Sequence, residues 1–143
     1  MVKLVIDANE LFSAIIAKGR GAQTKKLDIL FSDKIKLYAP SKLFEEVGKE
    51  KNAHKLRELS GFSNTEFDLF IELLKLRISC VPSKDFSDKF AKAEEICPHE
   101  KDIPYFALAL KLNCPIWSGE KKFIKQSEVP IFNTKDIIDK FEI

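Results

Sequence analysis

The chain has 143 residues and is 45% hydrophobic, which is enough for one globular domain, residues 1–143, with a sizeable core. Its 24 basic and 22 acidic residues nearly cancel, so the net charge of +2 carries no signal for nucleic-acid binding, although local patches decide such binding. No apolar run approaches the roughly 18 residues that a membrane-spanning helix needs, and we expect no membrane association.

The first predicted element is a short apolar run, residues 4–6, which is typical of a buried strand in a parallel sheet. The run ends in Asp7. Open α/β sheets bind their ligands at the carboxyl ends of the strands, so Asp7 is a candidate active-site residue. Asp is also a good N-cap, here for a helix predicted at residues 8–17, and this fragment alone does not separate the two interpretations.

Strands and helices then alternate along the chain. Further strands are predicted at residues 36–39, 78–81, 115–118 and 129–132. Further helices are predicted at residues 23–31, 42–47, 54–59, 64–76, 86–96, 103–112 and 134–141. This alternation predicts an α/β fold with a mainly parallel sheet of roughly five strands.

The chain has three cysteines, Cys80, Cys97 and Cys114, and no CxxC pair. An odd number without such a pair argues against both a disulfide framework and a zinc site. Cys80 lies in a predicted strand and Cys114 lies beside one, so we expect buried thiols in a reducing compartment. With no signal peptide ahead of the first strand, the expectation is a soluble, cytoplasmic protein.

Four carboxylates lie at or near the ends of these elements. They are Asp7, Glu46, Asp102 and Glu120. The acids beside strands one, two and four are assigned to one edge of the sheet, and Asp102 joins them if its helix begins there. Clustered carboxylates repel one another unless a cation neutralises them, and oxygen-only sites favour Mg²⁺ or Mn²⁺. Such an ion can activate a water for hydrolysis of a phosphodiester.

Each acid also has a purely structural interpretation, which is the favoured one when that acid is taken singly. Asp102 is suited to N-cap its helix, and Glu120 to sit at the positive end of a following one. Glu46 is suited to a solvated helix face, and its neighbour Glu45 is by composition an equally eligible ligand. The argument for a metal site therefore depends on the four acids together.

Four stretches in this order resemble the motifs of PIN-domain nucleases, and the resemblance spans nearly the whole chain. They are Val-Ile-Asp-Ala-Asn at 5–9, Leu-Phe-Glu-Glu-Val at 43–47, Asp-Ile-Pro-Tyr-Phe-Ala-Leu-Ala-Leu at 102–110 and Ile-Trp-Ser-Gly-Glu at 116–120. The resemblance implies a three-layer α/β/α sandwich around a parallel sheet. It also implies a Mg²⁺- or Mn²⁺-dependent endoribonuclease in which clustered carboxylates hold a metal-activated water.

On this resemblance, Asp7, Glu46 and Asp102 match the three most characteristic acidic positions of the family. Glu46 is preferred over Glu45 because the family's Glu usually precedes an aliphatic residue, here a valine. The resemblance further assigns supporting roles to Asn9 and Ser118, which lie near the first and fourth acids. Glu120 stands where the family more often has Asp, and the extra methylene moves its carboxylate by over ~1 Å, a departure that matters for Mg²⁺ geometry.

RNA is expected to approach the site through basic residues that follow the predicted catalytic edge, although ordinary surface charge is the favoured interpretation of any one of them taken singly. They are Lys18, Arg20, Lys121 and Lys122. The resemblance also implies the toxin of a toxin–antitoxin pair, with an antitoxin protein as partner and a homodimer. The apolar stripe Phe67, Phe70 and Leu74 fits either such an interface or the protein's own core.

Two other functions remain open on the sequence. One is a PIN-like module that has lost catalysis and binds RNA or protein, which only Glu120 favours. The other is a different phosphate-handling α/β enzyme. The chain has only five glycines and neither a GxxxxGK[ST] loop nor a GxGxxG turn, which argues against the nucleotide-binding versions of that class.

Overall fold

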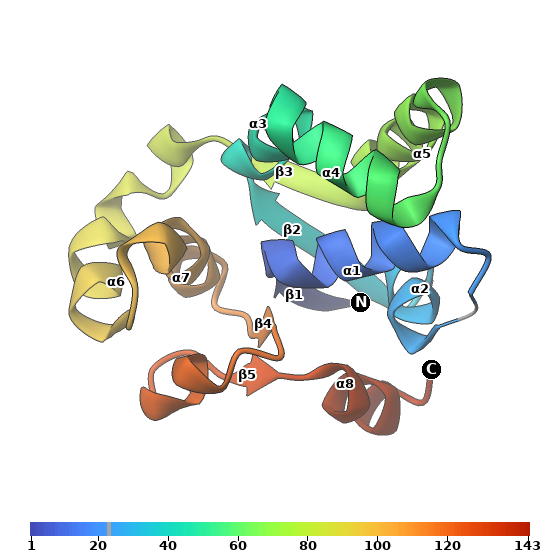
Figure 1. Ribbon diagram of the computed structural model, residues 1–143. Coiled ribbons are helices and arrows are strands. Elements are labelled where there is room, and N and C mark those ends of the chain that lie inside the picture. Colours follow the sequence, from blue (N-terminus) through green and yellow to red (C-terminus); the bar gives the residue numbers. More distant parts are fainter. Residues whose placement is uncertain (23) are drawn as a thin grey trace.

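A five-stranded sheet with strand order β3–β2–β1–β4–β5 forms the centre of the protein, seen here as a computed structural model (Figure 1). The middle strand, β1 (Val2–Ile6), pairs with β2 (Ile35–Pro40) on one side and with β4 (Ile116–Trp117) on the other. The edges are β3 (Ile78–Val81) and β5 (Ile131–Phe132). All four pairings are parallel, so the predicted parallel sheet is confirmed.

The structure describes residues 1–22 and 24–143, and its helices alternate with the strands as predicted. The α-helices are α1 (Ala8–Gly19), α2 (Lys25–Leu30), α3 (Lys42–Gly48), α4 (Glu50–Ser60), α5 (Asn64–Arg77), α6 (Phe90–Ile96), α7 (Ile103–Leu112) and α8 (Thr134–Phe141). Short 3-10 turns are η1 (Ser83–Asp85), η2 (Ser87–Lys89), η3 (Glu100–Asp102) and η4 (Lys121–Lys125). Gln23, the predicted start of the second helix, lies outside the described residues.

The two faces of the sheet are covered by two separate cores, which follow from the alternation of side chains along each strand. In β1, Leu4 and Ile6 belong to a core formed with helices α1 to α5 and α8, whereas Val5 belongs to a core formed with α6 and α7. Because both faces are covered, β1 is apolar along its buried half. The three-layer α/β/α architecture is thereby confirmed.

The apolar stripe of α5 packs into the protein's own core: Phe67, Phe70 and Leu74 are all buried. The outward face of this helix carries other large apolar residues, Leu69, Leu73 and Leu76, which are exposed. The interpretation of the buried stripe as a partner surface is therefore wrong, because these side chains are already covered by the fold.

The cysteines differ in burial. Cys114 precedes β4 and is buried as predicted, but Cys80 is exposed. The reason is topological, since Cys80 lies in β3, which forms an edge of the sheet. Throughout residues 1–22 and 24–143, no helix combines the length and apolar character that crossing a bilayer requires.

Candidate active site

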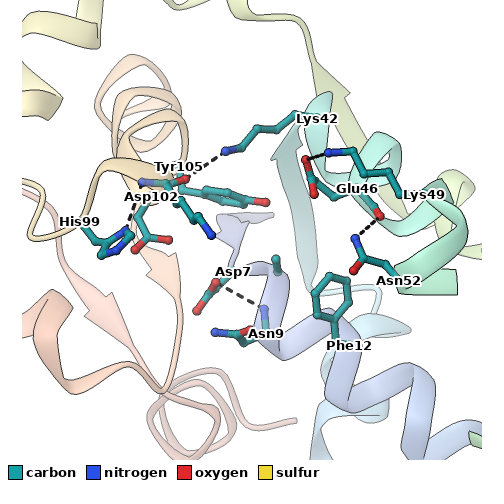
Figure 2. A pocket seen from close by; sticks show the side chains of 12 residues that line it. Asp7, Asn9, Phe12, Lys42, Glu46, Lys49, Asn52, His99, Asp102 and Tyr105 are labelled. Carbon is teal, nitrogen blue, oxygen red and sulfur yellow. Dashed lines mark hydrogen bonds and ion pairs between the residues drawn. The ribbon is translucent and has the colours of Figure 1, made fainter. Parts of the chain in front are cut away.

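A cleft of about 680 Å³ opens beside the carboxyl ends of β1 and β2, between α1, α3 and the segment that leads into α7 (Figure 2). Its lining residues are Asp7, Ala8, Asn9, Phe12, Lys42, Glu46, Lys49, Asn52, His99, Lys101, Asp102 and Tyr105. Three of the four acids selected from the sequence, and the supporting Asn9, thus share one cleft. Parallel strands bring these distant segments together because all their carboxyl ends meet at one edge.

Asp7 lies where the buried strand β1 ends and α1 begins, and it is only 5% exposed. One carboxylate oxygen, Oδ1, accepts the backbone N–H of Asn9 at 3.4 Å as a helix N-cap. The other, Oδ2, accepts the Ser118 hydroxyl at 2.7 Å. Asp7 therefore both caps the helix and faces the cleft, so the two interpretations of this residue are compatible.

Burial raises the pKa of Asp7 above its ordinary value, and the negative charges of Asp102 and Glu10 act in the same direction. The hydrogen bonds from Ser118 and from the Asn9 backbone oppose this rise because they stabilise the carboxylate. The ionised form of Asp7 is thus costly in this cleft, which is the condition that a bound cation relieves.

Asp102 occupies the N-cap position of α7, but its side chain makes no capping hydrogen bond. The carboxylate instead lines the cleft, so the predicted N-cap role holds for the position of Asp102 in the chain but not for its side chain. Burial raises the pKa of Asp102, the positive charges around His99 and Lys42 lower it, and the charge of Glu120 raises it. Two acids of the cleft therefore share the same electrostatic condition.

Glu46 approaches the cleft from α3 on the opposite side, and its neighbour Glu45 is exposed outside the lining. Its Oε1 forms an ion pair with Lys49 Nζ at 2.9 Å (Figure 2). This partner lowers the pKa of Glu46, the reverse of the shift at the two aspartates. Asn52 Nδ2 donates to the Glu46 carbonyl at 2.7 Å and ties α3 to α4 beside the site.

Glu120 does not line the cleft. Its backbone N–H donates to Ser118 Oγ at 3.0 Å, and its charge acts on Asp102 from the loop that follows β4. Ser118 itself is buried and joins this loop to Asp7. Within the described part of the chain, no three His, Cys, Asp or Glu side chains stand close enough together to hold a metal ion. Two aspartates and Glu46 thus face one cleft without forming a closed ligand shell.

The basic residues at the cleft are not those selected from the sequence. Lys42, Lys49 and Lys101 line it. Lys18 and Arg20 lie in the last turn and C-cap of α1, about 15–20 Å along the helix from Asp7. Lys121 and Lys122 follow Glu120 in η4 and are exposed outside the lining.

A signal for two of the missed lysines is present in the sequence. Lys42 comes two residues after the end of β2, so the rule that selected Asp7 also applies to it. Lys101 adjoins Asp102. In the structure the two lysines meet, because Lys42 Nζ donates to the Lys101 carbonyl at 3.0 Å.

Tyr105 closes the cleft from α7 and is 5% exposed. Burial raises its pKa, and the nearby charges of Asp7 and Asp102 raise it further, so the phenol keeps its proton. The ammonium of Lys42 lies 5.6 Å from the centre of the Tyr105 ring. On the rim, the Lys101 backbone N–H donates to His99 Nδ1 at 3.3 Å.

Comparison with known proteins agrees with this arrangement. A family model described as PIN domain matches residues 5–137, which include all four acids. An uncharacterised protein of Methanocaldococcus jannaschii is 25% identical over 152 aligned positions, which cover 99% of this chain and 92% of that protein. The family match covers far more than half of the sequence. The chain belongs to the PIN-domain family.

Proposed function

We infer from membership of the PIN-domain family that the protein is a nuclease. We propose that the protein is a metal-dependent endoribonuclease that hydrolyses RNA phosphodiester bonds. The observation that carries the proposal is the pair Asp7 and Asp102, two partly or fully buried acids that face one cleft and whose pKa values are both raised. Perturbed carboxylates of this kind are typical of functional sites and are costly in a merely structural role.

The donor set fits a hard divalent cation, because every candidate ligand is a carboxylate oxygen. Asp7, Glu46 and Asp102 would hold Mg²⁺ or Mn²⁺, with Glu120 assisting. When bound, such an ion lowers the pKa of water and stabilises negative charge on a phosphodiester. The ion pair of Glu46 with Lys49 uses Oε1 and is exposed, so it is weak enough to yield to a cation.

The chain's own residues supply the remaining functions. Lys42, Lys49 and Lys101 place three ammonium groups beside the acids, where they are suited to contact the phosphates of a bound strand. Ser118 holds Asp7 Oδ2, while Asp7 Oδ1 accepts, among the described residues, only the long hydrogen bond from the Asn9 backbone N–H at 3.4 Å. We extend the proposed RNA path to Lys121 and Lys122, and to Lys18 and Arg20 for an RNA long enough to follow α1.

The proposed biological role is the toxin of a toxin–antitoxin pair in the cytoplasm, acting as a homodimer and held inactive by a small protein. This part of the proposal rests on the family resemblance. Sedimentation of the purified protein tests whether it is a dimer. The toxin role is tested by inducing the protein in cells: growth should stop with the wild type and continue with an Asp7 variant.

The decisive experiment is cleavage of a mixed RNA pool by purified protein with Mn²⁺, with Mg²⁺ and with EDTA. A circular RNA is included because only an endonuclease opens it. Asp7→Asn is compared with Asp68→Asn, the same exchange at an exposed position of α5. We expect cleavage that needs the metal, is lost in Asp7→Asn and is retained in Asp68→Asn. Metal-independent cleavage, or equal cleavage by Asp7→Asn, contradicts the proposal.

One observation favours a second candidate, a nucleic-acid-binding module without catalysis. Glu46 is paired with Lys49 instead of converging with the two aspartates, and no closed group of three ligands forms among the described residues. This candidate predicts RNA binding that is unchanged by EDTA and by Asp7→Asn. Electrophoretic mobility shifts with uncleaved RNA therefore separate the two functions.

A further inference from the structure

Glu10 is a buried acid that the proposed reaction does not use. It lies in the first turn of α1, three residues after Asp7, and is 5% exposed, but it does not line the cleft. A buried carboxylate is costly unless its oxygens are satisfied, so its partners indicate what the position is for. From the sequence alone, Glu10 is interpreted as an ordinary acidic residue in the first turn of a helix.

The partners of Glu10 come from three other parts of the chain. Oε2 forms an ion pair with Lys26 Nζ of α2 at 2.8 Å and also accepts the Thr134 hydroxyl of α8 at 3.5 Å. Oε1 accepts the backbone N–H of Gly119 at 3.1 Å. The first two contacts join helices that are already packed, whereas the third contacts the loop after β4.

The contact with Gly119 is close. A Cβ at this position would lie 3.3 Å from Glu10 Oε1, tighter than an ordinary van der Waals contact. A side chain at 119 would therefore displace either the carboxylate or the loop. The absence of a side chain thus lets the loop backbone approach Glu10.

Gly119 stands between the two loop residues that belong to the candidate site. Ser118 donates to Asp7, and the N–H of Glu120 donates to Ser118 Oγ. The side chain of Glu10 therefore anchors the loop at the peptide between the hydroxyl that orients Asp7 and the fourth acid. No other side chain of the described residues is bonded to the Gly119 N–H.

We propose that Glu10 is a positioning residue that holds the loop 118–120 through the Gly119 N–H and thereby sets the orientation of Ser118 and Glu120 toward the metal site. The inference rests on the proposed function for its catalytic meaning. Its geometric content, the control of loop conformation by Glu10, is independent of whether the protein cleaves RNA.

A pair of variants separates positioning from simple stabilisation. Glu10→Gln loses the ion pair with Lys26 but keeps an oxygen that can accept from Gly119. Glu10→Leu loses both. Ile137→Val in α8 serves as a control that lowers the melting temperature by shortening a fully buried side chain near Thr134, with no change to any bond of Glu10.

The first readout needs no activity. Amide NMR spectra should show displaced Gly119 and Glu120 signals in Glu10→Leu, near-native signals in Glu10→Gln and native ones in Ile137→Val. Paramagnetic broadening of the same amides by added Mn²⁺ should be weakened only in Glu10→Leu. If Glu10→Leu does not fold, Glu10→Ala takes its place, since it also removes both carboxylate oxygens but buries no added apolar branch.

The second readout is the Mn²⁺ concentration that gives half-maximal RNA cleavage. Loss of a residue that orients metal ligands typically costs 10–100-fold, so we expect an increase of about 10-fold or more in Glu10→Leu and less than about 3-fold in Glu10→Gln. Equal effects of the two variants, or effects that follow the melting temperature as in Ile137→Val, overturn the proposal. A wild type that does not cleave refutes the nuclease instead, and the amide signals still decide the role of Glu10.

Discussion

The hydrogen bond between Ser118 and Asp7 gives a quantitative prediction for Ser118→Ala. The two side chains are 2% and 5% exposed, and the Oγ–Oδ2 distance is 2.7 Å. Hydrogen bonds to charged groups contribute roughly 1.5–3 kcal/mol, and a buried carboxylate that loses one is not rehydrated. We therefore expect the free energy of unfolding to fall by about 2 kcal/mol near neutral pH.

The size of this loss should depend on pH. Burial raises the pKa of Asp7 in the folded protein above 3.8, so between that value and the folded pKa the native state binds more protons than the unfolded chain. Stability contributed by Asp7 is therefore lost as the pH rises through this interval. The Ser118 bond limits the rise in pKa, so its removal widens the interval. At acidic pH below the folded pKa of Asp7, where the carboxyl group is protonated, the loss should shrink to about 1 kcal/mol.

Urea unfolding followed by the fluorescence of Trp117, the one tryptophan of the chain, measures both values. Ser60→Ala is a matched control because Ser60 is also 2% exposed but bonds only backbone groups, those of Arg57 and Phe62. Its cost should not change between the two pH values. A loss below about 0.5 kcal/mol for Ser118→Ala, or one as independent of pH as the control, would refute the reasoning.

Three further predictions concern other parts of the protein. Asp102→Asn should reduce metal-dependent cleavage by more than about 100-fold while the protein stays folded, as measured by single-turnover assays and circular dichroism. Lys49→Gln should release Glu46, so the pKa of Glu46 should rise toward its ordinary value, which NMR titration of the carboxyl carbon measures. The free energy of unfolding should change by less than about 0.5 kcal/mol, because this ion pair is exposed. Gly61→Ala should cost about 1 kcal/mol in urea unfolding, because Gly61 ends α4 at φ = 80° with no atom within 4 Å of the added Cβ, so backbone strain alone is responsible.

The order and type of most elements could be predicted from local pattern. The position of Asp7 followed from one apolar run and from the rule that parallel strands share a ligand-binding edge. The boundary between α3 and α4 was less predictable. The sequence predicts one helix up to residue 47 and the next from residue 54, yet α4 already begins at Glu50, because the backbone of Lys49 alone is extended and separates the two helices.

The environment of the site was predicted less well than its acids. Lys18 and Arg20 are close to Asp7 in sequence but far along the helix axis, whereas Lys42 and Lys101 are distant in sequence and line the same cleft. The burial of Glu10 depends on α2, α8 and the loop after β4, none of which its sequence neighbours reveal. Contacts between side chains that are distant in sequence depend on the tertiary fold, and hydrophobic periodicity does not predict them.

The hydrogen bond from Ser118 to Asp7 spans 111 positions of the sequence. During translation residues 1–81 emerge first, and they form the strands β1, β2 and β3 and the helices α1 to α5. That early portion contains Asp7 and Glu46 but neither Asp102 nor Ser118. For an enzyme proposed to cut RNA, this order keeps the nascent chain without a complete site while it is still attached to its own message. A chain that terminates before residue 102 should for the same reason be harmless to the cell that makes it.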